Sequence, residues 1–224
     1  MRSTCAARAA VIELRTVLPM HSTPITVDPN PWVSMWLSPR ATVRWLIADR
    51  PGYLTHLLIA VALFSDMIRS ATLGGLGDRL SLETILMIMG SVALPYMILY
   101  LYVFAWIVKW AGRLFGGRAT VMEVRTALAW ASVPLFASAL LIIPKLLLFG
   151  VSMFRHDGLV ASSATIAFGV MDVVLVVWWF VILIVAVAEA HQFALWKALI
   201  SYLLSFATVI LSIFGPVLYF ASRP

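Results

Sequence analysis

The sequence predicts an all-α membrane protein: a polytopic bundle of five transmembrane helices, preceded by an N-terminal amphipathic helix at the membrane interface. Of the 224 residues, 62% are hydrophobic and 12% are charged, and the mean hydropathy is +1.00. A soluble domain is about half apolar and about a quarter charged, so much of the surface of this protein must face lipid. Five apolar runs are long enough to cross about 30 Å of hydrocarbon. They lack the alternation of barrel strands, and helices satisfy their own backbone hydrogen bonds in lipid.

The five spans are expected at residues 53–70, 84–108, 128–151, 164–187 and 198–220. They belong to one membrane domain, residues 32–221, and residues 1–31 are expected to be a mobile tail. Arg2, Arg8 and Glu13 interrupt the apolar stretches of this tail, so no cleavable signal peptide is expected. The loops between spans are too short for a soluble catalytic domain. We therefore expect a protein that is not an enzyme and uses no cofactor.

Basic residues predict the orientation of the spans. An odd number of spans places the two chain ends on opposite sides of the membrane. Eight Lys and Arg residues flank the spans on one side, namely Arg40, Arg44, Arg50, Lys109, Arg113, Arg118, Arg125 and Lys197. The other side has four, namely Arg69, Arg79, Arg155 and Arg223. Because cytoplasmic loops carry more Lys and Arg, the N-terminus is expected in the cytoplasm and the C-terminus outside. The Arg-rich and Ala-rich composition favours a bacterial inner membrane.

Two short helices are expected just before the first span. Asn30 precedes Pro31 and Ser38 precedes Pro39, which places a capping side chain before a proline at the first helical position. Helices are therefore expected to begin at residues 31 and 39, each capped by the preceding side chain.

These short helices are amphipathic. Trp32 and Trp36 lie on one helical face, and Arg40 and Arg44, just after Pro39, lie four residues apart on a polar side. Tryptophan beside apolar residues with arginine opposite is typical of the lipid headgroup layer. The segment is either a plain anchor for the first span or a surface that docks a cytosolic partner or senses lipid.

A glycine pair and a capping box lie between the second and third spans. Gly116 and Gly117 allow a tight turn, and Thr120 with Glu123 three residues later predicts a helix that begins near residue 121. Pro134 is expected to kink this helix. The segment is either a simple re-entry turn or a cytoplasmic hinge or docking corner.

The order of these motifs resembles the Yip family, which has the Ypt-interacting-protein domain. The likeness covers about residues 32–220 and rests on five spans and on Ser38-Pro39-Arg40, Gly116-Gly117, the box of Thr120 and Glu123, Trp130 to Pro134, and Glu189-Ala190-His191 before Lys197. Such proteins have five spans and a cytoplasmic N-terminus. Eukaryotic members associate with prenylated Rab-type GTPases and with vesicle formation between ER and Golgi, whereas prokaryotic members lack those partners. The short expected tail of this chain departs from the eukaryotic pattern, so GTPase recruitment does not follow from the likeness.

Three charged residues are expected below the membrane surface. Asp66 lies in the first span, Lys145 in the third and Asp172 in the fourth, all in the outer half on the predicted topology. Each costs about 2.5 to 3.5 kcal/mol at the bilayer centre, so pairing among them or a wet cavity is expected. They form either an ion or proton pathway or a structural salt bridge, with snorkelling open to Asp66 and Lys145.

Prolines interrupt the second and third spans. Pro95, Pro134 and Pro144 are expected to break these helices, and broken helices expose carbonyls that transporters use to bind ions. Small residues four positions apart, such as Ser201 and Ser205, permit close helix packing, and this leaves a homo-oligomer open.

Other site chemistries are not expected. Cys5 is the only cysteine, which excludes an intrachain disulfide. Glu189, His191 and His56 lie near span ends without metal-ligand spacing, so no metal site is expected. The basic residues are scattered, which argues against binding nucleic acid.

Two functions remain. The first is a non-enzymatic adaptor or membrane organiser of Yip type, which acts through its cytoplasmic face on a membrane-protein or cytosolic partner. The alternative is a small-solute or ion transporter or channel that uses Asp66, Lys145 and Asp172.

Overall fold

The computed structural model describes residues 30–155 and 163–221, the last seven of these as backbone only, and every regular element in these ranges is helical. The predicted mobile tail lies outside the described residues except for its last two. The helices are α2 (Pro31–Leu37), α3 (Pro39–Asp49), α4 (Thr55–Leu73), α5 (Leu82–Ile98), α6 (Ala105–Leu114), α7 (Val121–Ala131), α8 (Val133–Phe149), α9 (Ser163–His191) and α10 (Leu195–Ala221). Three short helices of other types are the 3-10 helices η1 (Leu76–Asp78) and η3 (Gly150–Phe154) and the π-helix η2 (Leu99–Phe104).

Within the described residues, five helical stretches are long and apolar enough to cross a membrane. They are Thr55–Leu73, Leu82–Leu114, Val121–Phe154, Ser163–His191 and Leu195–Phe214. The number of spans and the fold class are confirmed. The third stretch begins seven residues earlier than the expected 128, at its capping box, and the fourth continues four residues past the expected 187, to His191. Side chains such as Leu147 and Val173 are 82% and 63% exposed, so lipid must cover them.

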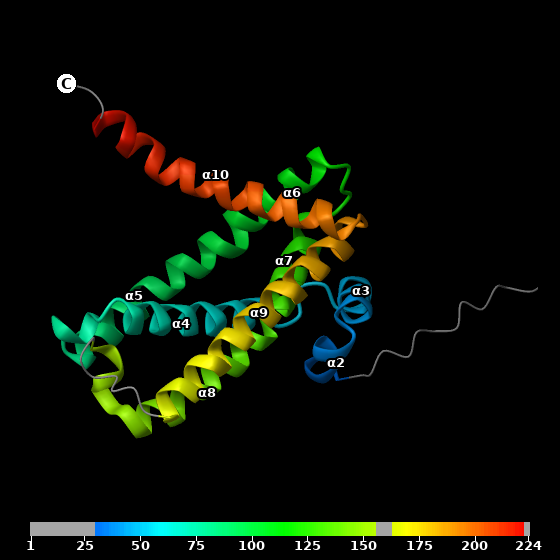
Figure 1. The fold of residues 1–224 in the computed structure, drawn as a ribbon. Coiled ribbons are helices and arrows are strands. Elements are labelled where there is room, and N and C mark those ends of the chain that lie inside the picture. Colours follow the sequence, from blue (N-terminus) through cyan, green and yellow to red (C-terminus); the bar gives the residue numbers. More distant parts are fainter. Residues whose placement is uncertain (1–29, 156–162, 222–224) are drawn as a thin grey trace, which may run out of the picture.

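The bundle has two ends (Figure 1). At one end α3 packs against α7 and α9, and α6 packs against the first part of α10. We call this end, with α2, α3 and the turns at 115–120 and 192–194, the basic end. At the opposite end η1 lies beside η3, and Asp78 pairs with Arg155 at 3.8 Å. The segments that the count of Lys and Arg residues assigns to the cytoplasmic side therefore lie together at the basic end.

The core is divided in the same way. The larger cluster fills the half of the bundle nearest the basic end, and its fully buried members include Met35, Leu46, Trp130 and Leu183. A smaller cluster around Ile85, Met89, Met153 and Phe154 closes the opposite end. The basic end is thus the more extensively packed half.

The structure corrects one predicted cap. The Asn30 side chain accepts a hydrogen bond from the backbone N–H of Trp32 at 3.1 Å, as expected. Ser38 does precede α3, but its side chain does not cap that helix. Its hydroxyl donates instead to the carbonyl of Ser34 at 3.2 Å, in the last turn of α2. Pro39, which fixes φ at the first position, starts α3 without a side-chain cap.

The expected proline breaks are wrong at two of three positions. Pro144 lies inside α8, which continues to Phe149. Pro95 lies inside α5, and the helix becomes the π-helical turn η2 a few residues later without a break in the span. Pro134 does follow an interruption, because α7 ends at Ala131 and α8 begins at Val133. Transmembrane helices tolerate proline by local π-type adjustment, and the turn η2 after Pro95 is such an adjustment.

Candidate functional site

Arg40 and Arg44 of α3 reach a buried carboxylate at the end of α9. Arg44 Nε donates to Glu189 Oε1 at 2.7 Å, and Arg40 Nε lies 3.6 Å from Glu189 Oε2. The Glu189 side chain is only 7% exposed, whereas both arginines are about half exposed. The hydrogen bond and the charge of Glu189 raise the pKa of Arg44 above its ordinary value. Both arginines of the predicted docking face therefore hold α3 on the bundle.

The segment from α2 to the start of α4 is also fastened to α7. The Trp32 ring meets the ring of buried Trp130 edge to face, with centroids 5.5 Å apart. Trp130 Nε1 donates to the carbonyl of Tyr53 at 3.0 Å, and the N–H of Gly52 donates to Thr126 Oγ1 at 2.9 Å. Trp36 is half-buried against the same core. The tryptophan face therefore packs on the bundle itself.

The glycine pair ends α6 with a Schellman motif. The N–H of Gly117 donates to the carbonyl of Gly112 at 2.9 Å and that of Gly116 to Arg113 at 3.0 Å. Gly116 has φ +84°, the left-handed conformation that favours glycine at this position.

The end of α9 carries the same motif and faces the first one. The N–H of Phe193 donates to the carbonyl of Ala188 at 3.1 Å, and that of Gln192 donates to Glu189 at 3.2 Å. Gln192 takes the left-handed conformation with φ 57°, and its side-chain Nε2 donates to the Glu189 carbonyl at 2.6 Å. The Arg118 N–H then donates to the His191 carbonyl at 3.3 Å and joins the two turns.

His191 fills a slot between these two helix ends. Its side chain is fully buried, and its ring stacks on Phe193 with centroids 5.0 Å apart. A Cβ on Gly112 would lie 2.2 Å from His191 Cε1, and one on Gly117 would lie 2.3 Å from Nδ1. Neither ring nitrogen has a hydrogen-bond partner among the described residues. The two glycines therefore provide the space that the ring occupies.

The predicted capping box forms and begins α7 next to this slot. Glu123 N–H donates to Thr120 Oγ1 at 3.3 Å, and the Thr120 N–H donates to Glu123 Oε2 at 2.6 Å. Both side chains satisfy backbone donors at the helix start. Thr120 and Glu123 therefore fix the direction in which the chain leaves the glycine turn.

Basic side chains of this end lie on aromatic rings. Arg125 Cζ lies 4.0 Å from the Tyr102 ring centroid, and its Nε donates to the carbonyl of Leu101 at 2.8 Å. Lys197 lies over Trp196 and donates to the carbonyl of Phe115 at 3.2 Å. Cations beside tryptophan and tyrosine are typical of a membrane–water interface.

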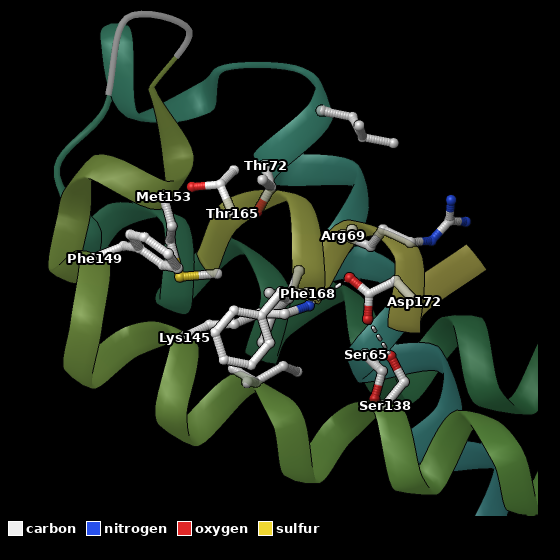
Figure 2. A pocket seen from close by; sticks show the side chains of 14 residues that line it. Ser65, Arg69, Thr72, Ser138, Lys145, Phe149, Met153, Thr165, Phe168 and Asp172 are labelled. Atoms are coloured by element: carbon white, nitrogen blue, oxygen red, sulfur yellow. Dashed lines mark hydrogen bonds and ion pairs between the residues drawn. The ribbon is translucent and has the colours of Figure 1, made fainter. Parts of the chain in front are cut away.

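The structure brings together two of the three predicted intramembrane charges. Lys145 Nζ of α8 forms an ion pair and hydrogen bond with Asp172 Oδ2 of α9, and Ser138 Oγ donates to Asp172 Oδ1 at 3.2 Å (Figure 2). The side chains of Lys145 and Asp172 are 15% and 23% exposed. They line a cavity of about 200 Å³ between α4, α8 and α9. Each charge thus offsets the cost of placing the other in lipid.

Asp66 does not join this pair. Its carboxylate forms an ion pair with Arg69 one helical turn later in α4, and these side chains are 40% and 45% exposed. Of the pairing considered among these three charges, the structure therefore shows Lys145 with Asp172, whereas Asp66 is paired with a nearer cation on its own helix.

The Yip1 domain matches residues 33–215, which run from within α2 through most of α10. The chain belongs to the Yip1 domain family. No curated protein and no solved structure matches it.

Two residues of this Yip1 domain, Glu189 and His191, have contacts that the sequence pattern does not indicate. Glu189 and His191 contribute to the family likeness, but their packing against α3 and the glycine turn was not anticipated. A signal was present for Glu189, because it directly follows the apolar run of the fourth span and a carboxylate there requires a cation. His191 gave no comparable signal, since its slot exists only when α6 and α9 are packed.

Proposed function

We propose that this Yip1-domain protein is a non-enzymatic adaptor or membrane organiser whose working surface is the basic end, and that this end faces the cytoplasm. One observation supports the proposal above the others. Three segments far apart in the chain are locked together there by the pairing of Glu189 with Arg44 and by the slot that holds His191. A surface held by such contacts presents its exposed groups in a fixed arrangement, which favours recognition of a partner.

Exposed groups remain available on this surface. Leu37 is 84% exposed and Leu114 is 74% exposed, and Arg118 is exposed in the glycine turn. Apolar side chains between basic residues suit a membrane-associated protein partner or an amphipathic segment of one.

Site-specific photocrosslinking tests this proposal. A photoreactive amino acid is placed at residue 37 or 118 of the basic end, or at residue 79 of the opposite end as the matched control. We expect discrete protein adducts from the first two positions, and we expect Glu189→Gln to abolish them. Equal adducts from all three positions, or adducts that do not depend on Glu189, would contradict the proposal.

Transport is the second candidate, and the Lys145–Asp172 pair is the observation that favours it. A charged pair that lines a cavity can exchange partners with a passing ion. Flux measurements in reconstituted vesicles decide the question, with Asp172→Asn as the test and the more exposed Asp66→Asn as the control. Flux that only Asp172→Asn removes would favour transport, whereas a protein without flux whose adducts depend on Glu189 supports the adaptor.

A further inference from the structure

A second and larger cavity lies inside the membrane-spanning part of the bundle. Its volume is about 480 Å³, and its walls come from α4, α5, η2, α6, α8, α9 and α10, including Ala62, Tyr100, Trp179 and Val209. This volume is in the range of small-molecule sites, which is about 300 to 1,000 Å³. Most of the lining is aliphatic or aromatic, so the cavity suits a hydrocarbon chain.

The cavity opens toward lipid rather than toward water. Figure 1 shows α10 diverging from α5 beyond the region where α10 packs on α6. The lining residues Leu99 and Val103 of η2 and Phe206 and Ile213 of α10 are 51%, 47%, 52% and 58% exposed. In a membrane, the acyl chains of surrounding lipids therefore have direct access to the cavity.

Opposite charges line this cavity near the opposite end of the bundle. Arg69 lies four residues before the end of α4, which is about 6 Å along the helix axis at 1.5 Å per residue. Asp66 lies one turn deeper and pairs with it. Ser65, Arg69 and Ser138 also line the smaller cavity that holds the Lys145–Asp172 pair, so the two cavities share a wall.

This arrangement of charge and apolar surface complements one class of ligand. A zwitterionic phospholipid carries a phosphate and an ammonium group joined by a short two-carbon link, with apolar acyl chains below them. An arginine guanidinium binds phosphate through several parallel N–H donors, and a carboxylate accepts from an ammonium. The side chains of Arg69 and Asp66 are 45% and 40% exposed, so both can reach such a headgroup.

We propose that this cavity binds a glycerophospholipid with a zwitterionic headgroup. The phosphate binds Arg69, the ammonium group binds Asp66, and one acyl chain lies between η2 and α10. The site is independent of the basic end, so it is a lipid-binding function in addition to the proposed adaptor role.

Native mass spectrometry of the purified full chain tests the headgroup. The probes are phosphatidylethanolamine and a diacylglycerol with the same acyl chains. We expect about tenfold stronger retention of the phospholipid, equivalent to about 1.4 kcal/mol. Arg69→Met should remove this preference, whereas Arg79→Met, in the exposed turn after α4, should not. A preference that survives Arg69→Met in a variant with wild-type helicity would overturn the headgroup assignment.

A second pair of variants tests the cavity. Val209→Trp places a large ring in the cavity and should lower retention of both probes, whereas Val170→Trp, on a 59% exposed surface position of α9, should not. Equal effects of the two substitutions would indicate lipid bound elsewhere on the bundle. Retention of a second copy of the chain in place of lipid would also overturn the proposal.

Crosslinking of the unmodified sequence gives a result that does not depend on the folding of a variant. Phosphatidylethanolamine with a diazirine in its acyl chain should label peptides that contain residues 99–103 and 206–213. Labelling spread evenly over exposed faces, including residues 170–174 of α9, would contradict the proposal.

Discussion

Substitution of Gly112 by alanine tests the interlock of α6 and α9 most sharply. The added methyl would lie 2.2 Å from His191 Cε1 and 2.5 Å from Nε2. The ring cannot move easily, because it is fully buried and stacks on Phe193. Overpacking costs about 1 to 3 kcal/mol, and the higher helix propensity of alanine returns about 1 kcal/mol. Because the contact is far inside van der Waals distance, we expect the overpacking cost to be at the upper end of its range, about 3 kcal/mol. After the gain in helix propensity, the net loss in the free energy of unfolding is about 2 kcal/mol.

The assay is thermal unfolding in detergent followed by size-exclusion chromatography. A loss of about 2 kcal/mol corresponds to a fall in Tm of about 4 to 8 °C for a chain of this size. Gly90→Ala in α5 is the matched control, because no atom lies within 4 Å of the added Cβ. His191→Ala removes the clash, so adding Gly112→Ala to it should cost little more. Equal Tm values for Gly112→Ala and Gly90→Ala, or additive losses in the double variant, would refute the reasoning.

Three further predictions concern the other contacts. Glu189→Gln removes the charge that holds α3, so trypsin should cleave after Arg44 several-fold faster than in the wild type. Because Arg44 is half exposed, the expected loss in the free energy of unfolding is only about 1 kcal/mol. An unchanged cleavage rate would show that the pair does not hold α3. Lys145→Met leaves Asp172 without its cation and should lower the Tm more than Lys145→Met combined with Asp172→Asn. The reason is that one unpaired buried charge destabilises the fold more than the removal of both charges does. A larger fall in Tm for the double variant would contradict this. Thr120→Ala removes the cap of α7 and should lower the free energy of unfolding by about 1 kcal/mol, measured as a fall in Tm relative to the wild type; no change would show that the cap is dispensable.

The parts of the fold that depend on local chemistry could be predicted from the sequence. The spans follow from uninterrupted apolar runs, and the capping box of Thr120 and Glu123 follows from a spacing of three residues. The pair of Asp66 and Arg69 could have been recognised in the same way, since residues three apart lie on one helical face. The break expected at Pro144 is absent because a proline inside a membrane helix has ways to compensate its missing hydrogen bond.

The parts that depend on packing could not be predicted. Arg44 and Glu189 are 145 residues apart, and nothing local in either segment indicates the other. The role of Gly112 as a wall of the His191 slot depends on the crossing of α6 and α9, which the sequence pattern does not specify. The sequence could therefore identify the motifs of the basic end but not the contacts that join them.

The orientation of the bundle is the central claim, because the adaptor proposal requires the basic end to face the cytoplasm. Single cysteines replace Arg118 at the basic end or Arg79 at the opposite end, in a chain that carries Cys5→Ser. Both positions are exposed. A membrane-impermeant maleimide should label Arg79→Cys in intact cells and label Arg118→Cys only after permeabilisation. Labelling of both positions from the same side, or labelling in the reverse order, would contradict the account.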